Sequence, residues 1–275
     1  MSGPITPQGP PLPKSLSIFV TRPGKELYEV TVEFDDAKGR LADLLGCLPE
    51  PGCSVVALHV APLPHAEAAG TARAPLLARL HLAVTPPIDA EAIRHCLEGK
   101  AYVLGAIVRS GLSGVLIDSS FPLYLTERAR AIVLDAHRAS DMLDNLRLRM
   151  GSGGAVLMYE QGRAYGESAG AAYVRTFGSA FLRTHPEYAL RLFTAMGWGE
   201  TELLEYDFDH GTARLTMRDG FECRSQRSPI PYSQFIRGCL AGVISAVTDR
   251  IVDCTETHCI AQGDDRCEFA IRPRA

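Results

Sequence analysis

Residues 253–269 read DCTETHCIAQGDDRCEF, a dense run of cysteine and acidic residues near the end of the sequence. Glu256 and Cys259 form a Glu-x-x-Cys pair, and Gly263 begins a Gly-Asp-x-x-Cys-x-Phe pattern that contains Cys267. A cytosolic chain of 275 residues does not need disulfides for stability. The three clustered cysteines, out of eight in the chain, therefore require another explanation.

The sequence around this run predicts an α+β domain. The expected elements, read backwards along the chain, are strands at 268–271 and 251–255, a helix at 235–247, a hairpin of strands 212–217 and 202–208, helices at 187–196 and 170–182, a strand at 155–159, and a long amphipathic helix from Leu125 that ends at Gly151. The helix at 235–247 carries Gly238 and Gly242, and glycines at this spacing allow close packing against another element.

These ordered motifs, Gly238-x-x-x-Gly242, Glu256-x-x-Cys259 and Gly263-Asp-x-x-Cys267-x-Phe, resemble the vinyl-4-reductase domain family. The resemblance defines an expected domain of residues 123–275. The family includes archaeal stand-alone proteins, a bacteriochlorophyll-synthesis protein and the sensory domains of phenol-responsive transcription activators. Its fold is similar to that of vesicle-tethering TRAPP subunits, and its members commonly dimerise. The resemblance therefore implies a homodimer that binds a small hydrophobic or aromatic molecule.

The resemblance also implies a zinc site. In the aromatic-sensing members, zinc is held by a cysteine before the Gly-x-x-x-Gly helix, by the glutamate and by the two later cysteines. Glu256, Cys259 and Cys267 match three of these ligands, but Ser233 occupies the fourth position, and a serine hydroxyl is a poor zinc ligand. The site has either lost a ligand or takes one from elsewhere. The candidates for a replacement are Cys223, Cys239, Cys254 and His258.

Two interpretations of these residues remain open. Zinc held by four protein ligands would be structural rather than catalytic, because it would have no open coordination position. Alternatively, Cys259 and Cys267 are an unmetallated buried pair.

Aromatic and polar residues in the predicted helices are candidates for the lining of a ligand pocket. A pocket is expected between the helices of residues 170–198 and the helix at 235–247, with a histidine that could bind a phenol-like hydroxyl. The candidates are Tyr173, Phe177, His185, Tyr188, Phe193 and Trp198. The alternative is that they pack in the core.

The N-terminal part predicts a different domain. Residues 15–110 show the order strand, helix, strand, strand, helix, strand, which is typical of a ferredoxin-like sandwich. The segment VTVEFDDAKGRLADLL at 30–45 resembles the opening of ACT regulatory domains, which bind effectors near this loop. The resemblance implies an effector loop at Asp36 and Gly39, although Lys38 stands where the family usually has proline. A plain strand-to-helix turn is the alternative.

The remaining features limit the function. With a net charge of -4, the chain has no excess of basic residues that would indicate direct binding to nucleic acid. Residues 1–14 are rich in proline and glycine and predict a disordered lead-in rather than a secretory signal, and residues 111–122 predict a linker. No apolar run approaches the roughly 20 residues that span a bilayer. These features favour a cytoplasmic protein without a membrane span.

No catalytic residues are expected. Residues 166–170 match the Gly-x-Ser-x-Gly motif of hydrolases, but no strand leads directly into them. The favoured function is a regulatory protein that senses or carries a small molecule and has no DNA-binding or ATPase module of its own. The alternatives are an accessory or pigment-precursor carrier of tetrapyrrole vinyl reduction and a purely structural adaptor.

Overall fold

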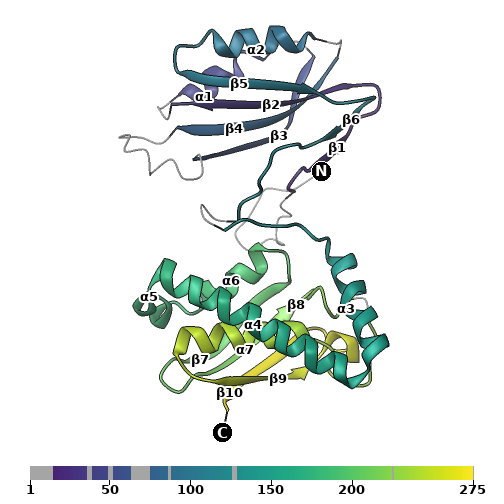
Figure 1. The fold of residues 1–275 in the computed structure, drawn as a ribbon, viewed down its shortest axis with the longest axis vertical. Coiled ribbons are helices and arrows are strands. Elements are labelled where there is room, and N and C mark those ends of the chain that lie inside the picture. Colours follow the sequence, from purple (N-terminus) through teal and green to yellow (C-terminus); the bar gives the residue numbers. More distant parts are fainter. Residues whose placement is uncertain are drawn as a thin grey trace. The chain divides into compact units, whose positions relative to one another are not determined.

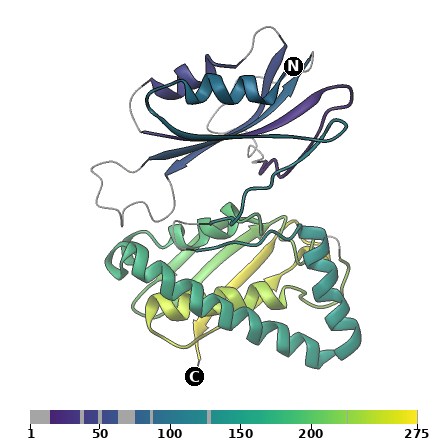
Figure 2. The ribbon, with the colours of Figure 1, turned by 45° about the horizontal axis from the view of Figure 1, so that its top comes forward.

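The computed structural model describes residues 15–35, 39–48, 52–62, 75–85, 88–125, 129–224 and 226–274. The chain divides into two compact units, Met1–Ile132 and Val133–Ala275 (Figures 1 and 2). The expected lead-in at residues 1–14 and Asp36 of the expected effector loop lie outside the described residues. Among the described helices, none combines the length and the apolar character needed to cross a membrane.

The N-terminal unit contains a four-stranded antiparallel sheet in the order β3-β4-β2-β5. Its elements are β2 (Glu26–Phe34), α1 (Arg40–Leu45), β3 (Cys53–Pro62), β4 (Leu76–Val84), α2 (Ala90–Glu98) and β5 (Val103–Ser110). Successive side chains of a strand point to opposite faces, so Val30, Val32 and Phe34 enter the core together. From α2, Ile93 and Leu97 join the same core. The alternation that predicts β2 thus also determines which of its faces is buried.

Residues 111–122, expected as a linker, contain a strand of the N-terminal unit. This strand, β6 (Val115–Ile117), pairs antiparallel with β1 (Phe19–Thr21). Just after it, the Ser119 hydroxyl donates a hydrogen bond of 2.9 Å to the buried carboxylate of Glu29 on β2. The division between the two units falls later, after Ile132.

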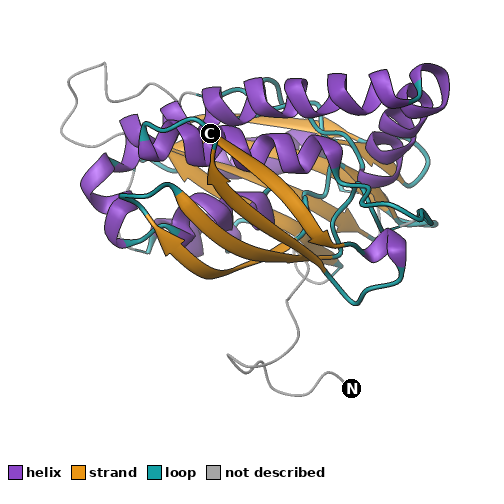
Figure 3. Ribbon diagram, turned by 90° about the horizontal axis from the view of Figure 1, so that it is seen from below, coloured by secondary structure: helices purple, strands orange, loops and turns teal. Residues whose placement is uncertain are grey.

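The C-terminal unit contains a second four-stranded antiparallel sheet, in the order β7-β8-β10-β9. Its strands are β7 (Glu200–Asp207), β8 (Thr212–Arg218), β9 (Val252–His258) and β10 (Cys267–Pro273). Its helices are α3 (Ala136–Met150), α4 (Ser152–Phe177), α5 (Ser179–Thr184), α6 (Glu187–Ala195) and α7 (Gln234–Thr248). In Figure 3 the helices and the strands of this unit form separate layers. The core residues Met158, Phe193, Leu215, Leu240 and Phe269 are fully buried.

Two helices of this unit, α4 and α7, lie side by side (Figures 1 and 2). A Cβ atom added at Gly238 of α7 would overlap the Tyr159 carbonyl oxygen of α4, and one added at Gly166 of α4 would overlap the Cys239 carbonyl oxygen of α7. The Gly-x-x-x-Gly helix therefore uses its glycines for a close contact between backbones within the chain.

This contact corrects the strand expected at 155–159. That segment belongs to α4, a helix of 26 residues. A short apolar run does not distinguish a strand from a buried helix, whereas Gly162, Gly166 and Gly170 recur every four residues and mark one helical face. Ser168 consequently lies inside a helix and cannot be the tip of a nucleophile elbow.

The long helix expected from Leu125 also begins later than predicted. Its first residue is Ala136, because the Asp135 side chain caps the helix by accepting a hydrogen bond of 2.9 Å from the Arg138 backbone N–H. Upstream apolar residues such as Ile132 are exposed rather than packed on a helical face.

Candidate metal centre

Four buried side chains converge near the N-terminus of α7. The ligand atoms of Cys223, Glu256, Cys259 and Cys267 all lie within 4.8 Å of one another. Each of the four residues is at most 4% exposed. The Cys223 and Cys259 sulfurs are 3.7 Å apart, and two sulfurs at about 2.3 Å from one tetrahedral zinc are about 3.8 Å apart. The spacing of this pair therefore fits a single tetrahedral metal ion.

The four donors come from three separate segments of the chain. Cys223 lies in the turn between β8 and α7, Glu256 lies in β9, Cys259 follows the end of β9, and Cys267 is the first residue of β10. The β9–β10 ladder has a register shift between Glu268 and Phe269, which pairs Phe269 with Glu256. The centre thus joins a hairpin to a turn more than thirty residues earlier.

The Gly-Asp step of the sequence motif shapes the loop between Cys259 and Cys267. Gly263 has φ 108°, in the left-handed region that favours glycine. The Asp264 carboxylate accepts a hydrogen bond of 2.7 Å from the Cys259 backbone N–H. Together these residues turn the chain so that both cysteines reach the same centre.

Ser233 lies at the centre but supports the carboxylate ligand. Its hydroxyl donates to Glu256 at 2.7 Å, and its backbone N–H donates to the other Glu256 oxygen at 2.9 Å. Its Oγ is also 2.8 Å from the Cys223 sulfur. Of the four replacement ligands left open by the sequence, only Cys223 belongs to the described cluster. The side chain of His258 is exposed and pairs with Glu268 at 3.1 Å.

Glu222 fixes the turn that carries Cys223. Its fully buried carboxylate accepts hydrogen bonds from the backbone N–H groups of Phe235 at 3.1 Å and Ile236 at 2.9 Å, at the start of α7. It also forms an ion pair with Arg147 of α3. The sequence reasoning missed Glu222, although an acidic residue beside a candidate ligand was a usable signal.

The electrostatics of the centre favour a cation. Burial raises the pKa of Glu256 to about 7, against the hydrogen bonds from Ser233 that lower it. The Cys223 thiol stabilises the neighbouring thiolate through a hydrogen bond, which strongly lowers the pKa of Cys259, while the pKa of Cys223 itself is raised. Four donors this close cannot all ionise unless positive charge is added between them.

The six aromatic and polar residues expected to line a pocket separate into two groups. In the first, Tyr173, Phe177, His185 and Tyr188 join through Phe181, with successive ring centroids 5.0 to 6.5 Å apart. Phe177, His185 and Tyr188 are exposed on this group.

In the second group, the buried Phe193 meets Trp198, with ring centroids 5.4 Å apart. Trp198 also contacts the rings of Tyr165, Phe221 and Phe235. These rings form part of the core of the unit. In the N-terminal unit, Gly39 has φ 90° and precedes α1 without a side-chain cap.

The vinyl-4-reductase domain family matches this chain at residues 213–273. The match includes all four residues of the metal centre. No curated protein matches the chain significantly.

Three solved structures are similar to about half of the chain. The phenol-responsive sensory domain of the transcription activator PoxR has 16% identity and a TM-score of 0.45, covering 54% of this chain and 78% of its own. A trafficking protein particle complex subunit 3 from Naegleria fowleri has 18% identity and a TM-score of 0.41, covering 51% and 95%. A vinyl-4-reductase family protein from Methanocaldococcus jannaschii has 17% identity and a TM-score of 0.33, covering 53% and 100%.

Proposed function

We propose that the C-terminal unit holds a structural zinc ion and serves as a small-molecule-sensing domain. The observation that carries the proposal is the convergence of Cys223, Glu256, Cys259 and Cys267, whose ligand atoms lie within 4.8 Å in a buried position. Three thiolates and a carboxylate suit tetrahedral zinc, and four protein ligands leave no position for a substrate. The ion therefore supplies stability rather than catalysis.

The position of the centre explains what the ion stabilises. It connects the β9–β10 hairpin with the turn before α7, and α7 is the helix that packs against α4. Without a cation, the same donors would be held together only by weak thiol hydrogen bonds and the Ser233 contacts. Metal binding at such a site adds directly to the folding free energy.

The sensing part of the proposal is supported by the vinyl-4-reductase domain match and by the first aromatic group. Tyr173, Phe177, His185 and Tyr188 present adjoining rings of which several faces are open to solvent. A hydrophobic or aromatic molecule would cover these faces, and His185 could bind a phenol-like hydroxyl. The unit would respond to the ligand by a gain in stability.

For the N-terminal unit we propose an ACT-type, ferredoxin-like regulatory domain at residues 15–110. The antiparallel order β3-β4-β2-β5, with one helix after β2 and one after β4, supports this assignment. A small effector near Gly39 would be its ligand.

Metal analysis of the purified full-length chain tests the zinc site. We expect about one equivalent of zinc per chain, as one tetrahedral site requires. The variant Cys223→Ala should lose the zinc, whereas Cys254→Ala, which removes a buried cysteine of β9 outside the cluster, should retain it. Wild-type protein that neither carries zinc nor takes it up after reduction would disprove the site.

Thermal shift with phenol tests the sensing role, because a ligand that binds only the folded state raises the melting temperature. Phenol should stabilise the full-length chain more than cyclohexanol does. Phe177→Ala should weaken phenol binding about tenfold, the loss expected for one aromatic contact. Phe208→Ala, which removes a half-buried ring outside the group, is the control. Equal effects of the two variants would count against this location.

A further inference from the structure

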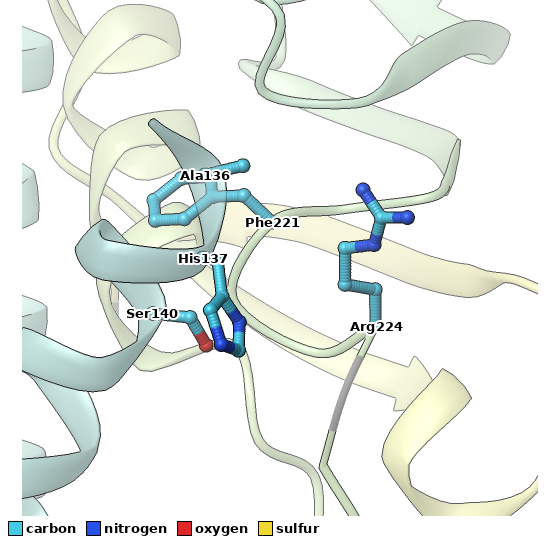
Figure 4. A pocket seen from close by; sticks show the side chains of 5 residues that line it. All are labelled: Ala136, His137, Ser140, Phe221 and Arg224. Atoms are coloured by element: carbon cyan, nitrogen blue, oxygen red, sulfur yellow. The ribbon is translucent and has the colours of Figure 1, made fainter. Parts of the chain in front are cut away.

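A cavity of about 280 Å³ lies between the first turns of α3 and the turn that carries Cys223. Its lining residues are Ala136, His137, Ser140, Phe221 and Arg224 (Figure 4). None of these belongs to the aromatic group that we assign to a neutral ligand. The cavity is at the small end of the range for ligand pockets, which suits a molecule with a single ring.

The floor of this cavity contains an unpaired polar group. Ser140 is 2% exposed, yet its hydroxyl has no hydrogen-bond partner in the described part of the chain. A helical serine commonly bonds the carbonyl four residues earlier, but the Ser140 hydroxyl does not. Buried hydroxyl groups in proteins are nearly always paired, so this one points to a bound oxygen atom in the cavity.

The rim carries positive charge of limited strength. Arg224 is half-exposed, and its Nε is 3.2 Å from Asp219 Oδ1, its one ion-pair partner among the described residues. That contact leaves the two terminal nitrogens of the guanidinium for a ligand. His137 is exposed, and its Nε2 is 3.9 Å from Asp141. Because carboxylates accompany both basic groups, the rim suits a single negative charge better than the double charge of a phosphate.

The wall is apolar and held in place. Phe221 is 8% exposed, and its ring packs against Trp198 with centroids 5.7 Å apart. Ala136 lines the opposite side, on α3. Phe221 and Arg224 lie on either side of Glu222 and Cys223, which anchor the turn to α7 and to the metal centre. The two lining residues on this turn are therefore positioned before a ligand arrives.

We propose that this cavity binds a small aromatic carboxylate. One carboxylate oxygen accepts the Ser140 hydroxyl, the charge pairs with the terminal nitrogens of Arg224, and the ring lies against Phe221. The guanidinium fork matches the geometry of a carboxylate. This site goes beyond the proposed function, since it differs from the phenol-type site in its residues and in the charge of its ligand.

Isothermal titration of the full-length, zinc-loaded chain with benzoate tests the inference. We expect saturable binding that weakens about tenfold or more in Arg224→Gln and in Ser140→Ala, as the loss of a charge-assisted or a buried hydrogen bond predicts. Arg227→Gln, which removes an exposed arginine three residues away, should bind benzoate like the wild type. Acetate should bind more weakly than benzoate because it lacks the ring.

Several outcomes would overturn the site. These are no saturable binding of benzoate up to about 10 mM, far weaker than a specific site requires, equal affinities in Arg224→Gln and Arg227→Gln, and tighter binding of inorganic phosphate than of benzoate. Because Ser140→Ala removes an unpaired hydroxyl, the variant should fold at least as stably as the wild type. Phenol titrations of the same variants separate this site from the proposed sensing site, since neither substitution should change phenol binding.

Discussion

Glu222 and Glu256 are both buried around the N-terminus of α7, and both accept hydrogen bonds from its first backbone N–H groups or its cap. Burial raises the pKa of each. Glu222 is compensated within the protein, because Arg147 forms an ion pair with it. Glu256 instead faces three thiols, and no basic side chain among the described residues forms an ion pair with it. Where the chain provides a cation, a carboxylate has a structural role. Where the chain provides only further donors, the arrangement calls for a cation from solution.

Removing the internal cation should have the largest effect. Arg147→Met leaves Glu222 buried without its partner, and the expected loss is about 3–5 kcal/mol of unfolding free energy. Urea denaturation of the full-length chain measures it. Arg149→Met, on the same helix with only an exposed contact to Asn145, should change stability by less than about 0.5 kcal/mol. The double variant Arg147→Met/Glu222→Gln should recover part of the loss, and no recovery would contradict the charge argument.

Removing the external cation should have the next largest effect. If free zinc is 100-fold above its dissociation constant, its removal by a chelator should cost about 2.7 kcal/mol of unfolding free energy. Denaturation with and without chelator measures this difference. In Cys223→Ala the chelator should have no effect, because the site is already lost. A chelator effect of the same size in that variant would mean that stabilising metal binds elsewhere.

The metal-free and zinc-loaded forms should differ in their response to pH. In the metal-free protein the pKa of Glu256 is raised from 4.5 to about 7. The folded state then favours the protonated carboxyl, so this contribution is complete below pH 4.5 and is lost as the pH rises to about 7. Zinc-loaded protein should show the opposite trend, since its ligands must be deprotonated. Glu256→Gln should abolish the metal-free trend, and its persistence in that variant would assign it to another group.

The sequence predicts the parts of the fold that depend on local patterns. Alternation in residues 27–34 predicts β2, and the periodic helix at 235–247 is present as α7. The failures depend on distant contacts. Ala155–Tyr159 is helical because the glycines of α4 face those of α7, and residues 115–117 form a strand because β1 pairs with them.

The metal centre divides in the same way. Glu256, Cys259 and Cys267 are close in sequence, and their spacing alone groups them. Cys223 is more than thirty residues earlier, and only the fold of the turn before α7 distinguishes it from Cys239 and Cys254. The Ser140 cavity could not be predicted, because its residues belong to segments that no local pattern connects.

Exchanging Cys223 and Ser233 should have the smallest effect and gives the sharpest test of the comparison. The Ser233 oxygen is 2.8 Å from the Cys223 sulfur and 3.8 Å from the Cys267 sulfur, so a thiolate at position 233 can reach the same ion. Cys223→Ser alone should lose zinc, and adding Ser233→Cys should restore one equivalent with an affinity within about tenfold of the wild type, a difference of about 1.4 kcal/mol.

Cobalt substitution reports the coordination, since tetrahedral thiolate-bound cobalt has strong visible and near-ultraviolet absorption. The same spectrum in the wild type and in the exchanged protein would show that the centre requires three thiolates and a carboxylate around one point, whichever segment supplies the third sulfur. If the exchanged protein binds no metal while remaining folded, then the turn at Cys223 contributes more than its thiolate, and Glu222 on that turn, with its partner Arg147 on α3, becomes part of the metal centre.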